Sequence, residues 1–398
     1  MRSNTRAVTR APSRSYGLLS RCEATSARIY QAQKSTVSIA LTALRRNSIS
    51  HADEQEATRP DQPERREELT ISPEDTSDVV VSTINKWIAK CLESPVGNRP
   101  VLKLREHIRL DPHCVSEHGI GIQIQFGNHK GNSLNRRLVE DLTTAFKTLA
   151  GVEKVNAVVL TSSSTTSTAF CGGASIEELA GIKSSEDARS FILRISGLCT
   201  AIRNFPGPVI AAIDGDCIGA GLEVAASCDI RLATKRSSFS MPEVALGIPS
   251  VVEARLLCDI MGWGMARDLM LTGRKLSSTG AVVSGLISGR YEDRNSMFEW
   301  ALKTVRNCSH ESAEVCKRQK RLMRDWESVS VKEGIALGVD SFASTFESGT
   351  NNVQKLANAI KARKSQNLIG GESANKGQSQ DKHRPRGKKS SSEQVAKV

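Results

Sequence analysis

Two glutamates, Glu223 and Glu243, stand twenty positions apart in mostly apolar surroundings within residues 208–247. An ionised carboxylate is costly to bury among Val, Ala, Leu and Met side chains, so such groups are candidates for proton transfer. The glycine-rich turn GDCIGAG leads into LEVAASC, which reads as the start of a helix carrying the first glutamate. That order predicts free backbone N–H groups, the positive end of a helix and a carboxylate within one small volume.

The spacing alone also allows purely structural roles for these residues. An acid in the first turn of a helix commonly serves the helix dipole, and Pro-Glu before an apolar run commonly forms a turn. Glycine and alanine in GAG also serve close packing. We interpret Cys171, Cys217 and Cys228 as small core residues.

A second glycine turn lies upstream in AFCGGASIEELAG, residues 169–181. The strand-like run NAVVLTS passes through a polar Ser/Thr segment into this turn, and a helix is expected after it. Backbone amides at two strand-to-helix turns can converge on one oxygen atom. The pattern therefore predicts an oxyanion hole made by the main chain.

These segments resemble the crotonase family, the enoyl-CoA hydratases and isomerases. FCGGASIEELA, IAAIDGDCIGAGLEVAASCDIRLA and FSMPEVALGIPS are similar to three of its signatures, in the family's order. KGNSLNRRLVEDL is similar to its K-x-N-A-L helix entry, and MLTGRKLSSTGAVVSGLIS to its LTG…A…GL stretch. The resemblance covers roughly residues 119–290.

The resemblance implies a set of substrate-binding residues. It assigns the oxyanion-hole amides to Gly172 and Ala220. The backbone expected to line the thioester and the adjoining part of coenzyme A is Gly172, Gly173, Ala174 and Ser175. Ser175 stands where the family usually has Asp, so the local coenzyme contacts differ from the usual pattern.

Glu223 and Glu243 match the family's two glutamates, which hold and activate water and exchange a proton with substrate. One carboxylate must take a proton from water while one carboxylic acid gives a proton to Cα. Our hypothesis makes Glu223 the base and Glu243 the donor, an order that the sequence leaves open. PSVVEARLL replaces a glycine-rich stretch and places Glu253 and Arg255 near the expected acyl pocket.

The expected function is enoyl-CoA hydratase, a hydro-lyase that adds water reversibly and with syn geometry to a 2-enoyl-CoA. Coenzyme A is part of the substrate, and no metal or redox cofactor is expected. One alternative is an enoyl-CoA delta-isomerase, which needs a single glutamate; another is a dehydratase of a specialised hydroxyacyl-CoA. The non-enzymatic alternative is an RNA-binding or scaffolding homologue, suggested by the basic C-terminal tail.

Charge is concentrated at the two ends of the chain. Of the net +12, residues 1–50 carry +8 and residues 361–398 carry +7, so the part between them is −3. Arg2, Arg6, Arg10 and Arg14 share one face of a possible helix in a segment almost free of acids, which is typical of a mitochondrial transit peptide. We expect the mitochondrial matrix rather than the cytoplasm or peroxisome, because Ala-Lys-Val at the end is unlike Ser-Lys-Leu. A plain basic tail is the alternative.

Metal and membrane signals are weak. The ten cysteines contain no CxxC pair, and no histidine lies between His129 and His310. The local group His113, Cys114 and His118 reads as loop residues rather than ligands. The sequence has no apolar run of about eighteen residues. A nucleic-acid partner is not expected, because the charge belongs to solvated ends.

The expected fold is α/β: a crotonase-like spiral of strand, strand and helix units followed by a helical C-terminal trimerisation domain. VVVSTINKWIAKCLE and LVEDLTTAFKTLA read as helices, VLKLREHIRL, PVIAAI and FSMPEV as strands, and residues 251–271 as two helices. By resemblance the chain forms a homotrimer or a dimer of trimers. The expected divisions are a transit peptide and disordered linker (1–76), an N-terminal extension (77–118), the spiral core (119–290), the helical domain (291–365) and a basic disordered tail (366–398).

Overall fold

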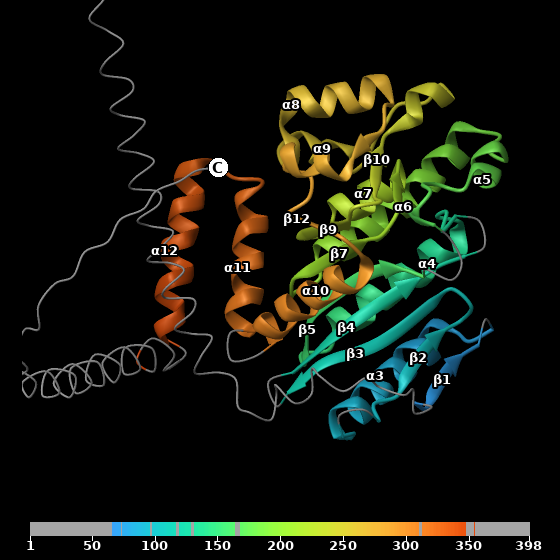
Figure 1. The fold of residues 1–398 in the computed structure, drawn as a ribbon. Helices are drawn as coiled ribbons and strands as arrows, with labels where there is room; N and C mark the ends of the chain where they lie inside the picture. Colours follow the sequence, from blue (N-terminus) through green and yellow to red (C-terminus); the bar gives the residue numbers. More distant parts are fainter. Residues whose placement is uncertain are drawn as a thin grey trace, which may run out of the picture. The chain divides into compact units, whose positions relative to one another are not determined.

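The computed structural model describes residues 66–347, apart from 73, 96–97, 117–118, 129–130, 164–167 and 310–312, together with residue 354. The predicted transit peptide and basic tail lie outside the described residues, as do parts of the His113–His118 group. Figure 1 shows the strands and the helices that surround them.

The strands form a large and a small sheet. In spatial order the large sheet contains β1 (Glu68–Ile71), β2 (Val101–Leu104), β3 (Ile108–Ser116), β4 (Gly119–Phe126), β5 (Val155–Ser162), β7 (Val209–Ile213), β9 (Ile230–Thr234) and β12 (Gly289–Tyr291). The small sheet contains β11 (Leu276–Ser277), β10 (Ser238–Ser240), β8 (Asp216–Ile218) and β6 (Ala169–Cys171).

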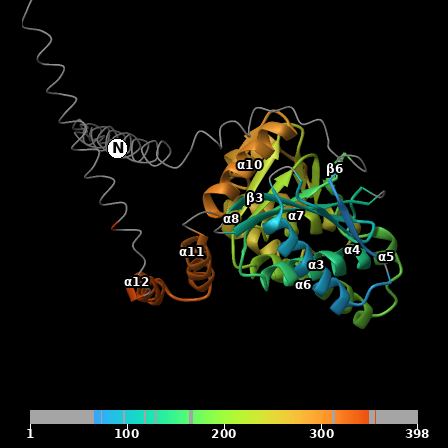
Figure 2. The same ribbon diagram turned by 90° about the horizontal axis from the view of Figure 1, so that it is seen from below.

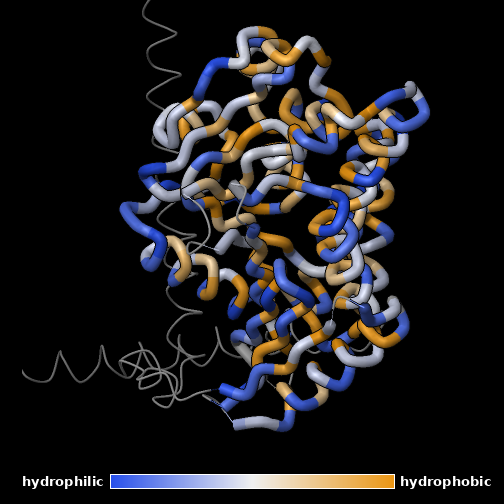
Figure 3. Tube along the Cα trace, turned by 90° about the vertical axis from the view of Figure 1, so that its right-hand side faces the viewer, coloured by the Kyte–Doolittle hydropathy of each residue, from blue (hydrophilic) through white to orange (hydrophobic). Residues whose placement is uncertain are grey.

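The helices follow the strands in a regular order. They are α3 (Ser77–Glu93), α4 (Arg136–Ala150), α5 (Ile176–Ala180), α6 (Ser185–Arg203), α7 (Ala220–Ala226), α8 (Ala254–Thr272), α9 (Ser278–Val283), α10 (Arg294–Ser309), α11 (Ala313–Trp326) and α12 (Val331–Glu347), with a 3₁₀ helix η1 (Pro242–Leu246). Hydrophobic and hydrophilic residues alternate within the helical turns in Figure 3, as expected of helices with one buried face.

The chain alternates between the two sheets before each return helix. β5, β6 and α5–α6 form one turn of this spiral, β7, β8 and α7 the next, and β9, β10, η1 and α8 a third. β4, β5, β7, β9 and β12 run parallel, and every residue of β5 and β7 is buried, as strands covered on both faces require. The predicted succession of strand, strand and helix is therefore present.

The small sheet determines where the functional segments lie. β6, β8 and β10 are parallel neighbours, with Ala169 and Ser238 both paired to Asp216. Their carboxyl ends share one edge, so the turns that leave them start side by side. Those turns are the two glycine turns and η1, the segments that the sequence singled out.

Helix α4 illustrates how periodicity fixes a helix. Leu138, Leu142, Phe146 and Leu149 are almost completely buried in the main core. Asn135 ends the preceding turn, and its Oδ1 accepts a hydrogen bond from the Leu138 N–H at 2.8 Å. The predicted helix LVEDLTTAFKTLA is confirmed.

The N-terminal boundaries differ from those predicted. Residues 66–76 were assigned to a disordered linker, yet Glu68–Ile71 form β1, which pairs in parallel with β2 and buries Ile71. The run VLKLREHIRL is a hairpin, not one strand, because the chain turns at Arg105 with φ 56°. The predicted extension 77–118 is continuous with the sheet, since β3 pairs with β4 along most of its length.

One further element differs locally from its prediction, and another agrees with it. FSMPEV was predicted as a strand, but only Ser238–Ser240 are extended, and Pro242 starts η1. Residues 251–271 contain the predicted break, because Gly262 (φ 78°, ψ 152°) interrupts α8.

The C-terminal helices are tied to the core in two ways. Met297, Ala301 and Val305 of α10 are buried in a cluster under the large sheet. α11 and α12 lie side by side in Figures 1 and 2. Lys320 of α11 is 7% exposed, and its Nζ lies 2.7 Å from Asp229 Oδ2 and 3.0 Å from the Gly207 carbonyl oxygen. The predicted helices are present up to Glu347, beyond which the prediction lies outside the described residues.

Candidate active site

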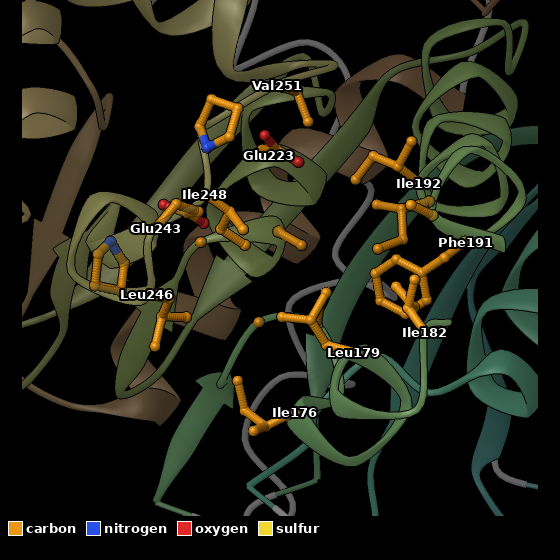
Figure 4. A pocket seen from close by; sticks show the side chains of 18 of the residues that line it. Ile176, Leu179, Ile182, Phe191, Ile192, Glu223, Glu243, Leu246, Ile248 and Val251 are labelled. Atoms are coloured by element: carbon orange, nitrogen blue, oxygen red, sulfur yellow. The ribbon is translucent and has the colours of Figure 1, made fainter. Parts of the chain in front are cut away.

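A cavity of about 480 Å³ lies where the three segments meet. Glu223 and Glu243 lie on one side of it in Figure 4, and Ile182, Phe191 and Ile192 on the other. Apart from the glutamates, its lining is mainly aliphatic and aromatic. A site of this kind binds an apolar group next to a few polar atoms that act on it.

Glu223 is held by a turn that requires glycine. Gly219 has φ 52° and ψ −124°, a conformation that residues with a Cβ rarely adopt, and α7 begins directly after it. Glu223 lies one turn further along and is 3% exposed. Burial, followed by the nearby charges of Glu243 and Glu253, raises its pKa to about 8 from an ordinary value of 4.5, although the Ala254 N–H opposes the shift.

Glu243 lies on η1 and is less buried than Glu223. The Ser250 hydroxyl donates a hydrogen bond to its Oε2 at 3.0 Å. Its Oε1 lies over the turn before α7, where a Cβ on Gly219 would approach it to 2.4 Å. Glycine at this position therefore serves both the backbone turn and the space that Glu243 occupies.

The raised pKa of Glu223 changes the predicted division of labour. With a pKa of about 8, Glu223 carries a proton at neutral pH in the free protein, because an ion in its apolar setting is costly. Our sequence hypothesis made Glu223 the base and Glu243 the proton donor. The burial of Glu223 favours the reverse order.

The Ala220 N–H is a free donor at the cavity. Ala220 is the first residue of α7 and lines the cavity, and its N–H has no hydrogen-bond acceptor among the described residues. The other glycine turn packs against it, since a Cβ on Gly173 would lie 3.8 Å from the Ala220 nitrogen. A helix N-terminus with an unpaired N–H favours an oxygen that carries negative charge.

The predicted second donor is not free in this structure. The Gly172 N–H donates to the carbonyl oxygen of Gly131 at 3.0 Å. The segment containing Gly131 crosses this turn and pairs with it, because the Leu134 N–H bonds to the Gly173 carbonyl and the Ser175 N–H bonds to the Leu134 carbonyl. Of the two predicted amides, Ala220 is thus unpaired among the described residues, and Gly172 is paired with Gly131.

The other predicted binding residues have different roles. Gly172, Gly173 and Ala174 line the cavity, whereas Ser175 does not. The Ser175 hydroxyl instead accepts a hydrogen bond from the Glu178 N–H at 3.4 Å and caps α5. The residue that replaces the family's usual Asp thus serves a helix terminus.

Two further predictions concern the segment after η1. Arg255, expected near the acyl pocket, is exposed; it pairs with Asp259 at 2.7 Å and lies 5.4 Å from the Trp263 ring centroid. Glu253 interacts electrostatically with Glu223 but is not part of the cavity lining. Sequence reasoning missed Ser250, whose only signal was its place seven residues after Glu243.

Other classes of site receive no support from the described part of the chain. Cys171, Cys217 and Cys228 are buried in the core, as predicted, and burial raises the pKa of their thiols. Within the described ranges no three His, Cys, Asp or Glu side chains gather as metal ligands would. The same ranges contain no helix with the length and apolarity to span a bilayer.

Comparison with known families finds enoyl-CoA hydratase/isomerase, matched over residues 117–363, more than half of the sequence. The chain belongs to the enoyl-CoA hydratase/isomerase family. The predicted family is confirmed, and it is a family of enzymes.

Members of this family with similar sequences carry hydratase names. The human mitochondrial methylglutaconyl-CoA hydratase is 30% identical over 230 residues, which cover 57% of this chain and 66% of the human one. The probable enoyl-CoA hydratase echA8 of Mycobacterium tuberculosis is 30% identical over 216 residues, covering 54% of this chain and 81% of the relative. The chain thus spans just under two thirds of the first relative and about four fifths of the second.

Solved structures confirm the fold. The enoyl-CoA hydratase of Bacillus anthracis superposes with a TM-score of 0.58 at 23% identity, covering 65% of this chain and 97% of that one. The enoyl-CoA hydratase/carnithine racemase of Magnetospirillum magneticum gives 0.56 at 26% identity, covering 65% and 93%. The predicted crotonase-like α/β spiral with helices at its C-terminal end is confirmed.

Proposed function

We propose that this chain is an enoyl-CoA hydratase, which adds water reversibly and with syn geometry to the double bond of a 2-enoyl-CoA thioester. One observation carries the proposal: two carboxyl groups in unequal environments line the same cavity as an unpaired helix N-terminal N–H. Hydration needs a base, an acid and a donor to the thioester oxygen, and these three groups supply them.

The proton transfers follow from the two environments. The Glu243 carboxylate takes a proton from water while the water oxygen bonds to C3 of the enoyl group. The electrons of the double bond shift toward the thioester oxygen, and the Glu223 carboxyl gives its proton to C2. Glu243 then holds a proton and Glu223 a charge, and dehydration runs the same steps backwards. All steps are an addition and proton transfers, so we propose no metal or redox cofactor.

The thioester oxygen is stabilised first by the Ala220 N–H. The Gly172 N–H becomes a second donor when the thioester oxygen replaces the Gly131 carbonyl as its acceptor. A single well-placed donor of this kind contributes roughly 2.7–4 kcal/mol to transition-state stabilisation. The amides of Gly173 and Ala174 belong to the same turn, where we place the thioester end of coenzyme A.

The acyl group is proposed to be a hydrocarbon chain. The wall opposite the glutamates is formed by Ile176, Leu179, Ile182, Phe191 and Ile192. Among the described lining residues, Arg189 is the one basic side chain, and it is exposed. Burying a chain of methylenes on such a wall gains about 0.8 kcal/mol for each CH₂.

The test is a substrate panel with the full chain. We expect water addition to crotonyl-CoA and to longer straight-chain 2-enoyl-CoA thioesters. The reaction is monitored as loss of absorbance of the conjugated thioester. A 3-enoyl-CoA arm detects isomerase activity, and a 3-methylglutaconyl-CoA arm tests an acyl group that bears a carboxylate, with Arg189→Gln as its matched variant. Isomerisation without hydration, or no reaction with any enoyl thioester, contradicts the proposal.

We also propose that the chain forms homo-oligomers through its C-terminal helices. α12 presents an exposed apolar stripe at helical spacing: Val331, Ile335, Val339, Phe342 and Phe346. Such a stripe is typical of an association surface. Light scattering after chromatography should give a trimer or hexamer, and Ile335→Asp with Phe342→Asp should lower the mass. We place the enzyme in the mitochondrial matrix, on the Arg-rich, acid-poor first fifty residues and on the mitochondrial names of the human and rat relatives.

A further inference from the structure

The segment from Ser250 to Glu253 connects η1 to α8, and it contacts Glu243 and lies beside Glu223 in Figure 4. Ser250 acts on Glu243, because its hydroxyl donates to Oε2 at 3.0 Å. This hydrogen bond fixes the position of one oxygen of the Glu243 carboxyl group.

Glu253 acts on Glu223 from outside the cavity lining. It occupies the N-cap position of α8, yet its side chain makes no capping hydrogen bond. Its Oε2 is instead buried and has no hydrogen-bond partner. The carboxyl group faces Ser196, Cys199 and Arg203 of α6, and burial raises its pKa although Arg203 opposes this. A negative charge at this place disfavours a second one on Glu223.

The backbone between these residues is strained in a way that separates their side chains. Val252 has φ 44°, which is unusual for a β-branched residue. Val251 on one side of it lines the cavity beside Glu223 in Figure 4, whereas Glu253 on the other side lies outside the lining. Strain of this kind persists where surrounding contacts hold the segment, and it is frequent at functional sites.

We propose that the segment Ser250–Glu253 is a positioning segment that fixes the Glu243 carboxyl group and keeps the proton on Glu223 before substrate binds. Ser250 holds the Glu243 carboxyl group by a hydrogen bond, and Glu253 favours the neutral form of Glu223. The inference rests on the proposed function, in which these two groups exchange protons with water and substrate. It also explains why this chain replaces a glycine-rich stretch with two polar side chains.

The charged groups around the pair are few. Glu223 faces Glu243 on η1 and Glu253 before α8, and Cys199 of α6 lies beside both Glu223 and Glu253. Arg203, which faces Glu253, is also paired with Glu327, the residue that follows α11. Glu253 therefore lies between the Arg203 cation and the Glu223 carboxyl group. A single substitution at Glu253 removes its charge from this group of residues.

The first test measures the proton on Glu223 directly. In the full chain labelled with ¹³C at glutamate side-chain carboxyls, the Glu223 resonance is assigned by its loss in Glu223→Gln. Glu253→Gln should lower the pKa of Glu223 by about one unit, because a nearby negative charge is removed. Glu253→Asp should keep the wild-type titration, and Glu299→Gln, on the exposed face of α10, is the matched control.

The second test uses the pH profile of kcat/KM. Glu253→Gln should move the alkaline limb, which needs protonated Glu223, to lower pH by a similar shift. Ser250→Ala should lower kcat without moving the alkaline limb, because the Glu243 carboxyl group loses the hydrogen bond that holds it, and Ser250→Thr should restore kcat. An unchanged Glu223 titration in folded Glu253→Gln overturns the inference. The titration is measured without turnover, so an inactive wild type would refute the proposed function alone.

Discussion

One wall of the cavity is made by α7, η1 and the turns before them, and the other by α5 and α6. The first wall presents two carboxyl groups and a backbone N–H, each held at a fixed place by a glycine turn or a hydrogen bond. The second presents mainly aliphatic and aromatic side chains. Substitutions in the first wall should change the rate of the chemical step, and those in the second should change which acyl groups bind.

The largest effect should come from removing either carboxyl group. Glu223→Gln and Glu243→Gln should each lower kcat for hydration by roughly 10²–10⁴-fold, because a general acid or base contributes that much. Affinity for the thioester, measured by calorimetry with the product, should change little. A variant that keeps nearly wild-type kcat would show that the first wall is not the reactive one.

The buried acid should also give the stability a distinctive pH dependence. The pKa of Glu223 in the folded state is about 8, above its ordinary value of 4.5, so the folded state keeps a proton that the unfolded chain releases. The free energy of unfolding should therefore fall as pH rises from about 5 to 8, by up to roughly 4 kcal/mol. Urea titrations should show a flatter dependence for Glu223→Gln, and an equally steep one would contradict the burial argument.

Replacing a glycine of positive φ by alanine distinguishes the effect of backbone strain on stability from the effect of site geometry on activity. Gly219→Ala should lower kcat by about 10²-fold, because the added Cβ would displace Glu243 and misplace the reactive group. Gly262→Ala is the matched control, since that glycine also has positive φ but open space around it. Both variants should lose similar stability, on the order of 1–3 kcal/mol. Equal losses of activity would place the effect in folding rather than in the site.

The smallest effect belongs to the apolar wall. Ile192→Ala should lower kcat/KM for a long-chain enoyl thioester by roughly tenfold, through lost burial of the chain, and leave crotonyl-CoA nearly unchanged. Leu193→Ala is the control, because the neighbouring leucine is exposed and lies outside the cavity lining. Equal effects on short and long chains would remove the distinction between the two walls.

Local sequence patterns predicted the elements whose burial is periodic. The spacing of Leu138, Leu142, Phe146 and Leu149 was sufficient for α4, and an apolar run was sufficient for β7. β1 escaped prediction because its four residues lie among charged neighbours and gain their order from pairing with β2.

The sequence predicted which residues form the site, but not their protonation and hydrogen bonding. Motifs pointed to Glu223 and Glu243, and the parallel small sheet brings their segments together. The proton on Glu223 depends on burial by distant helices, and the bond from Gly172 to Gly131 joins segments about forty residues apart. Neither can be deduced from local spacing. Arg255 turned outward because Asp259 and Trp263, one and two turns along α8, offered it partners at the surface.

The buried Lys320 has a practical consequence for shortening this enzyme. A truncated chain that stops after α10 would strip Asp229 of its ammonium partner, and Asp229 Oδ2 also accepts the Val209 N–H that begins β7. Losing one member of a fully buried ion pair commonly costs 3–5 kcal/mol, and the cost should be smaller here because the Asp229 side chain is 32% exposed. A soluble single-subunit version should therefore keep α11 and replace the apolar stripe of α12 with charged residues.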